Sequence, residues 1–229
     1  MLKTKKISIL NEVYEIEPFN FDIEINEALD NIYDITSSVC QNCKLSQLEV
    51  NKELVISTGY PRSKIMIISL NPSNNRRGNR VFGVQDNINH SIVESMLKKV
   101  NLTFDNVYIT NILKCSTENN KIDTEILPLC IKNKLIHEIS IVDPELIICL
   151  GETVSNFFGI DFRGNTNVIK NGDYIIAKAY HPSYYARKNG EGAENNFLEF
   201  KKIIDEINLK TFVNLHVHNE FSIRDGIGT

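Results

Sequence analysis

Five cysteines are the residues of this sequence best suited to hold an inorganic centre. Cys40 and Cys43 form a Cys-x2-Cys pair, which can present two thiolates to one metal centre, and Cys115 and Cys130 follow much later in the chain. Cys149 lies inside an apolar run and is expected in the core, where free cysteines are usually found. The other four stand in polar segments, and we expect them to form one four-sulfur site.

The spacing of these four cysteines leaves the nature of the site open. They could be unrelated thiols, or they could hold a structural zinc ion. A second Cys-x2-Cys pair would favour zinc, and the sequence has only one such pair. The wide, irregular second spacing suits an iron–sulfur cluster at least as well.

Polar residues follow three of the apolar runs along the chain. Asn71, Asn111 and His181 each stand at or just after the end of such a run. Ligands of parallel α/β sheets bind at the carboxyl ends of the strands. The sequence therefore predicts that these three side chains converge on one binding site.

Alternating strands and helices must position these residues. Continuous apolar runs, typical of strands buried on both faces, occupy 64–70, 107–113, 146–150 and 174–179. Helical patterns occupy 26–36, 90–100, 125–141, 153–158 and 195–207. This alternation predicts an α/β fold, a three-layer α/β/α domain with a central four-stranded parallel sheet. A small hairpin is predicted before it, over 7–16.

Composition narrows the function classes. With 229 residues, 42% of them hydrophobic and 24% charged, the chain fits one domain with a buried core. No apolar run approaches the ~18 residues of a membrane span. A net charge of −4 argues against non-specific coating of nucleic acid but allows a local basic face. Because the N-terminus lacks the pattern of an export signal, we expect a cytoplasmic protein without disulfides. We also expect it to be a monomer.

Several motifs together resemble family 4 uracil-DNA glycosylases. Residues 107–115, Val-Tyr-Ile-Thr-Asn-Ile-Leu-Lys-Cys, resemble the family segment that carries the uracil-reading asparagine and the third cluster cysteine. Further motifs of the family are matched in the right order by residues 40–45, Cys130, residues 143–151 and the His-Pro-Ser of 181–183. The resemblance spans about residues 26–207.

The resemblance implies a fold, a cofactor and a reaction. The fold is the α/β/α glycosylase fold, with a structural [4Fe–4S] cluster held by Cys40, Cys43, Cys115 and Cys130; zinc is the alternative. The reaction is hydrolysis of the N-glycosidic bond of deoxyuridine, so that DNA containing uracil is the expected partner.

The resemblance also implies roles for the site residues. The pocket must stack an extruded base and recognise its edge. It must also stabilise the negative charge that develops on the base as the bond to the sugar breaks. Phe82 would stack on uracil, the Asn111 amide can match N3–H and O4, and His181 can stabilise charge at O2. The alternatives are a core phenylalanine, a turn-capping asparagine and a surface histidine. Ser69, Leu70 and Ser183 belong to the same motifs and are expected to contact the substrate.

The first motif departs from the family pattern. Family 4 enzymes usually carry Gly-Glu-Ala-Pro-Gly where this chain has Ser-Leu-Asn-Pro-Ser at 69–73, and Arg76-Arg77 replaces an acidic pair. Asn71-Pro72 instead resembles the mismatch-specific and single-strand-selective branches of the superfamily, which use this asparagine to position water. We expect Asn71 to hold the attacking water by hydrogen bonding and not as a general base. Two alternatives are a catalytically silent DNA-binding module and a zinc-stabilised nucleic-acid adaptor.

Basic and aromatic residues near these motifs are candidates for DNA contact. Arg76, Arg77 and Arg80 form a basic loop that could bind phosphate or be merely solvated, and Lys98-Lys99 and Arg187-Lys188 could extend it. The candidates to fill the gap left by a flipped base are Tyr184, Tyr185 and Arg187.

The last residues carry a second resemblance. Residues 212–222 look like the first strand of the PHP domain of bacterial DNA polymerase III alpha subunits, in which a His-x-His pair, here His216 and His218, ligates metals. We expect an N-terminal extension over 1–25, a glycosylase-like domain over 26–210 and a truncated PHP-like segment over 211–229. The implied partner is a replicative DNA polymerase, in a bacterial or phage-infected cell.

Overall fold

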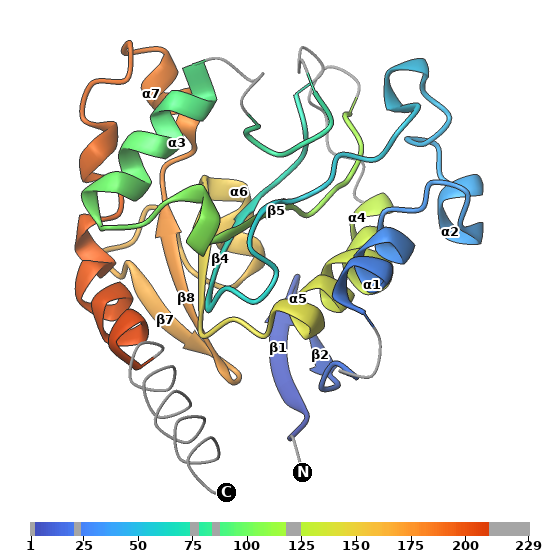
Figure 1. Cartoon of the computed structure of the whole chain (residues 1–229), viewed down its shortest axis with the longest axis horizontal. Coiled ribbons are helices and arrows are strands. Elements are labelled where there is room, and N and C mark those ends of the chain that lie inside the picture. Colours follow the sequence, from blue (N-terminus) through green and yellow to red (C-terminus); the bar gives the residue numbers. More distant parts are fainter. Residues whose placement is uncertain (1–2, 21–23, 74–77, 84–87, 118–124, 211–229) are drawn as a thin grey trace, which may run out of the picture.

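The fold is built around one mixed sheet. The structure, a computed structural model, describes residues 3–20, 24–73, 78–83, 88–117 and 125–210. Six strands pair in the order β3-β5-β4-β6-β8-β7. Helices lie on both sides of this sheet, with α3 and α7 on one side and α1, α4 and α5 on the other (Figure 1). The expected three-layer α/β/α architecture is confirmed.

The four predicted parallel strands form the centre of the sheet. They are β4 (Ile65–Ser69), β5 (Tyr108–Asn111), β6 (Leu146–Leu150) and β8 (Tyr174–Ala179). Two antiparallel edge strands flank them, β3 (Thr58–Gly59) and β7 (Val168–Asn171). The sequence did not predict these edges because β3 has only two residues and β7 is largely half-buried or exposed, which gives no continuous apolar run.

Alternate side chains of the central strands enter two separate cores. On β4, Ile65 and Ile67 pack on the side of α3, whereas Met66 and Ile68 pack on the side of α5. This period of two follows from the pleat of a strand. Because both faces are covered, every residue of β4 is buried, as the predicted apolar run required.

The helices differ in detail from the predicted spans. The named helices are α1 (Ile25–Ile32), α2 (Ser38–Gln41), α3 (Ile88–Lys99), α4 (Ile126–Cys130), α5 (Ile136–Val142), α6 (Glu152–Phe157) and α7 (Pro182–Ala186). The single helix expected over 125–141 is α4 and α5 joined by a π-helical turn, Ile131–Leu135. The last helix, expected over 195–207, begins as two 3-10 turns, Ala193–Asn195 and Leu198–Phe200, and is helical from 201 to 210.

A hairpin precedes the sheet, as predicted. Strands β1 (Lys5–Ile9) and β2 (Glu12–Ile16) are antiparallel, and Leu10 and Asn11 make the turn with positive φ angles of 55° and 63°. A two-residue turn of this kind matches the twist of a hairpin. The hairpin buries Ile7 and Ile9 completely in the core that also contains α5.

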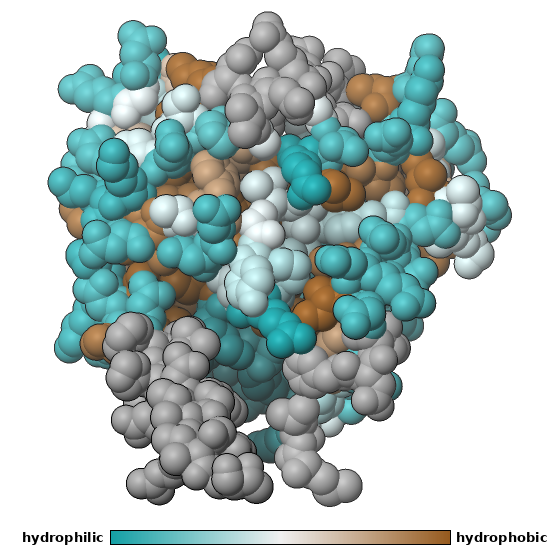
Figure 2. All heavy atoms as spheres, in the orientation of Figure 1, coloured by the Kyte–Doolittle hydropathy of each residue, from teal (hydrophilic) through white to brown (hydrophobic). Residues whose placement is uncertain are grey.

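The face of the protein shown in Figure 2 is mostly hydrophilic, with apolar patches scattered between polar side chains. None of the helices in the described ranges combines the length and apolar character needed to cross a bilayer.

Candidate functional site

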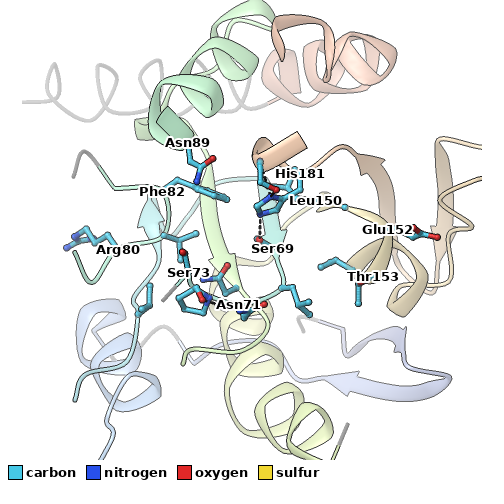
Figure 3. Close-up of a pocket in the computed structure, with 18 of the residues that line it drawn as sticks. Ser69, Asn71, Ser73, Arg80, Phe82, Asn89, Leu150, Glu152, Thr153 and His181 are labelled. Carbon is cyan, nitrogen blue, oxygen red and sulfur yellow. Dashed lines mark hydrogen bonds between the residues drawn. The ribbon is translucent and has the colours of Figure 1, made fainter. Parts of the chain in front are cut away.

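A cavity of about 600 Å³ opens at the carboxyl ends of the central strands. It brings together Asn71, Asn111 and His181, the three strand-end residues that the sequence singled out. The other predicted substrate residues also line it: Ser69, Leu70, Phe82 and Ser183. Phe82 and His181 lie on facing sides of its mouth, and Ser69 and Asn71 form its floor (Figure 3).

His181 is held by the helix that it begins. It is the N-cap of α7, and its Nδ1 accepts a hydrogen bond of 3.1 Å from the Ser183 backbone N–H. Pro182 suits the first helical position because it needs no N–H partner there. Since Nδ1 acts as the acceptor, the neutral imidazole carries its proton on Nε2, which lies 3.1 Å from Ser69 Oγ on the floor of the cavity. The sequence His-Pro-Ser thus presents one N–H donor to the cavity.

The protonation state of His181 follows from its surroundings. Burial, with a smaller contribution from the positive charge of Arg187, lowers the pKa of His181 from 6.5 to about 4. The imidazole is therefore neutral at physiological pH and can donate from Nε2 without carrying a positive charge.

This low pKa predicts the direction of a pH effect on stability. Between about pH 6.5 and pH 4 the unfolded chain binds a proton at His181 that the folded protein does not. We expect the contribution of His181 to the free energy of unfolding to be fully present above about pH 6.5 and to be lost progressively toward pH 4. Denaturant titrations of the protein and of His181→Asn across this range measure it; parallel pH dependence in the two proteins would contradict the assignment.

Two carboxamides reach the cavity with different constraints. Asn71 Nδ2 lies 3.1 Å from Pro72 O and 3.3 Å from Thr117 Oγ1, which fixes the amide and leaves Oδ1 as a free acceptor among the described contacts. Asn111 ends β5 and is buried, yet its carboxamide makes no hydrogen bond with another described residue. Asn71 is thus oriented by the protein, whereas Asn111 is available to a ligand.

Phe82 lies at the edge of the cavity in a tight turn. Its ring is 7% exposed, and its centroid is 5.8 Å from that of His181 at an angle of 56°. Its backbone is left-handed, with φ of 49°. The turn is tied to β3 and to the chain just before it, because Thr58 Oγ1 donates to Val81 O and Val81 N donates to Ile56 O.

Two cavity residues were missed by sequence reasoning. Asn89, in the first turn of α3, has a buried Oδ1 without a partner among the described residues. Glu152, in the first turn of α6, also lines the cavity, but it forms an ion pair of 2.9 Å with Arg163 and points away from His181 (Figure 3). Glu152 comes directly after the carboxyl end of β6, and this position in an α/β fold is a signal that could have identified it.

The predicted DNA-contact residues are not all on one surface. Arg80 is exposed, lines the cavity and donates to Ser57 O, and Arg187 is exposed at the end of α7. Tyr185 is 8% exposed and its hydroxyl donates to Asn196, so it belongs to the core and not to the exposed surface where a DNA contact was expected. Lys98 and Lys99 end α3, about 15 Å from the helix start at the cavity, so they do not extend its basic edge. Arg76 and Arg77 lie outside the described residues.

A buried ion pair lies directly beneath Asn111. Lys114 and Glu138, 1% and 0% exposed, are joined by a hydrogen bond. Lys114 Nζ also donates to the Asn111 carbonyl at 2.5 Å and to Thr110 Oγ1 at 2.7 Å. Glu138 Oε1 accepts from Tyr33, Tyr108 and Thr110. Burial, aided by the Glu138 carboxylate, raises the pKa of Tyr33 and Tyr108, which remain hydrogen donors.

The four candidate ligand cysteines line one small apolar hollow, and Lys114 also lines it. Cys40 lies in α2, and Cys43 comes shortly after the end of that helix. Cys115 comes after β5, and Cys130 is the last residue of α4. All are free thiols, and burial raises the pKa of Cys130 to about 11. No three His, Cys, Asp or Glu side chains in the described part of the chain are grouped closely enough to hold a single metal ion. The donor set, four thiols around one apolar hollow, fits a sulfur-ligated centre. Cys149 is a core residue, as expected.

Comparisons with known proteins show which family this chain resembles. The family model described as the uracil DNA glycosylase superfamily matches residues 56–208, more than half of the chain. A type-4 uracil-DNA glycosylase of Sulfurisphaera tokodaii is 28% identical over 171 residues, which cover 68% of this chain and 76% of that protein. One of Thermotoga maritima is 24% identical over 180 residues, 74% of this chain and 91% of that protein. One of Archaeoglobus fulgidus is 28% identical over 143 residues, 59% of this chain and 68% of that protein.

Proposed function

The chain belongs to the uracil DNA glycosylase superfamily, and on this premise we propose that it excises uracil from DNA by hydrolysing the N-glycosidic bond of deoxyuridine. The observation that carries this proposal is the convergence of Asn71, Phe82, Asn111 and His181 on one cavity. Products of the reaction would be free uracil and an abasic site.

Each of these residues has a geometry that suits one part of the reaction. The free Asn111 carboxamide can accept from N3–H and donate to O4 of an extruded uracil. The Phe82 ring can stack on the base. The Nε2–H of neutral His181 can donate to O2, where negative charge develops as the bond to the sugar breaks.

A strand-cleavage assay tests the proposal directly. The protein is incubated with a labelled oligonucleotide that contains one uracil, in single- and double-stranded form, and the product is treated with alkali. Cleavage at the uracil supports the proposal. Intact DNA at a large excess of protein would instead favour the catalytically silent DNA-binding module, which fits the lack of a free carboxylate among the described residues around Asn71.

Asn71 is proposed to hold the attacking water through Oδ1. Its Nδ2 is engaged by Pro72 and Thr117, so the acceptor oxygen has a fixed direction. We expect Asn71→Ala to lower kcat about a hundredfold, because the water loses its position, with KM within about twofold because the base contacts remain. Single-turnover kinetics on a single-stranded substrate separate the two quantities. An equal rise in KM with unchanged kcat would show that Asn71 binds substrate instead.

We further propose that Cys40, Cys43, Cys115 and Cys130 hold a [4Fe–4S] cluster, with zinc as the alternative. The support is the set of four free thiols around one apolar hollow, together with the order and spacing of the motifs. When bound, such a cluster would tie α2, α4 and the segment after β5 together. The residues themselves supply thiolate ligands and an apolar surround that limits access of water.

Replacing one ligand tests this assignment. The protein is expected to be brown with broad absorbance near about 400 nm, and Cys115→Ser is expected to lose most of this absorbance and of its iron. Cys149→Ser is the matched control, because Cys149 is a buried residue of β6 that does not line the hollow, so its replacement should leave the iron content unchanged. A colourless protein that contains zinc would establish the alternative.

The tail is assigned by its resemblance alone. We propose that 211–229 is the beginning of a PHP-like segment that associates the domain of 26–210 with a replicative polymerase. His216 and His218 lie outside the described residues.

A further inference from the structure

Phe82 occupies a backbone conformation that an aromatic residue rarely adopts. Its φ of 49° lies in the left-handed region, where the Cβ of an L-residue crowds the following carbonyl group. Such a conformation persists only where the surrounding structure holds it. The conformation places the ring at the cavity edge beside His181 (Figure 3).

His90 supplies a contact that holds this backbone. Its Nδ1 lies 2.8 Å from the carbonyl oxygen of Phe82. A carbonyl oxygen can only accept, so Nδ1 must carry the proton and donate. The imidazole is itself held, because it stacks on Phe104 with ring centroids 4.6 Å apart and planes 6° from parallel.

Other hydrogen bonds of the turn hold the peptide units on either side of Phe82, because Gly83 N–H belongs to the same unit as the Phe82 carbonyl and Val81 O belongs to the unit before it. Gly83 N donates to Arg80 O, while Val81 N and O pair with Ile56 and Thr58. Among the described contacts, the carbonyl of Phe82 is bonded only by His90. His90 therefore connects the first turn of α3, which supplies Ile88 and Asn89 to the cavity, with Phe82, which lies beside Asn89 (Figure 3).

We propose that His90 is a positioning residue for base stacking. It donates Nδ1–H to the Phe82 carbonyl and so adds to the hydrogen bonds that hold Phe82 in the left-handed conformation from which its ring can contact an extruded base. This inference rests on the proposed function and adds a residue that touches no substrate atom.

Two variants separate the hydrogen bond from the packing of the ring. His90→Phe keeps an aromatic ring against Phe104 and removes the donor. His90→Asn removes the ring but places an amide N–H close to the position of Nδ1. The probe is a single-stranded oligonucleotide with a 2′-fluorinated deoxyuridine, whose glycosidic bond resists cleavage, and a thymine oligonucleotide is the control. We expect His90→Phe to bind the probe about tenfold more weakly and His90→Asn to bind it within about threefold of the unaltered protein, since stacking on one aromatic ring accounts for roughly 5- to 150-fold in affinity.

A double-mutant cycle tests whether His90 acts through Phe82. In the Phe82→Ala background, His90→Phe should have no further effect on binding, because the ring that it positions is absent. Equal effects in both backgrounds would overturn the inference, as would a His90→Asn variant as weak as His90→Phe. Thermal unfolding of each variant identifies any general loss of folding. If the unaltered protein neither prefers the uracil probe to thymine nor cleaves uracil DNA, the proposed function itself fails; if it does both and His90→Phe binds equally well, only the inference fails.

Discussion

His181→Asn is expected to lower kcat for uracil removal by about a hundred- to a thousandfold. This is the usual effect of removing one preorganised donor from a developing negative charge. Asparagine can still cap α7, because its Oδ1 can accept from the Ser183 backbone N–H. It cannot reach Ser69 on the cavity floor, where Nε2 of His181 now lies. The variant therefore removes the donor and keeps the helix start.

His181→Gln is the matched control for this prediction. Its amide N–H can extend about as far as Nε2, while its side chain is a poorer cap. We expect it to retain more activity than His181→Asn despite lower thermal stability. Single-turnover rates at saturating enzyme and thermal unfolding provide the two measurements. The reverse order of activity would mean that the helix cap, and not the donor, is what the reaction requires.

Lys114→Met is expected to destabilise the protein by about 3–5 kcal/mol. The change leaves the Glu138 carboxylate completely buried without its cation, and removing one partner of a buried ion pair carries a cost of this size. The three hydroxyl donors of Tyr33, Tyr108 and Thr110 reduce this cost only in part. Urea unfolding of the variant and the unaltered protein, compared at constant m-value, measures the difference.

The double variant Lys114→Met/Glu138→Gln provides the control. Glutamine can still accept from the hydroxyl groups and leaves no unpaired charge, so much of the lost stability should return. If the double variant is as unstable as the single one, the loss arises from packing around Lys114 and not from the uncompensated charge.

The sequence was most informative where burial is continuous. β4, β5, β6 and β8 are buried on both faces, so their apolar runs identified them and the order of layers followed. The edge strands and the π-helical turn depend on neighbours that are distant in sequence, and no local pattern marks them.

In the candidate site, too, some residues could be predicted from local sequence and others depend on contacts between distant segments. Asn71, Asn111 and His181 were predicted to meet because parallel strands end at one edge, and they do line one cavity. Glu152 could have been expected from its place after β6, whereas Asn89 is an ordinary polar residue of a helix start that only the packed fold brings to the cavity. Tyr185 was misplaced because adjacent residues of a helix face different directions, and no periodicity is available in a helix of five residues.

One signal in the sequence could have revealed the buried ion pair. Glu138 follows Ile131 and Leu135 at helical spacing, so a carboxylate occupies the apolar stripe of the segment that contains α5. A charge at such a position requires a partner when it is buried. The identity of that partner, Lys114, depends on tertiary contacts that a single sequence does not display.

The hairpin of β1 and β2 is joined to the main sheet through the end of β7. The Asn171 side chain bonds both the N–H and the carbonyl of Ser8, as a neighbouring strand would, and also the carbonyl of Phe158. Gly172 is required there, because a Cβ would lie 2.0 Å from the Lys6 carbonyl oxygen. Without β1 and β2 the core would lose Ile7 and Ile9, and the Asn171 side chain would lose both of its hydrogen bonds to Ser8. The segment from Lys5 to Ile16 thus completes the core on this side of the sheet.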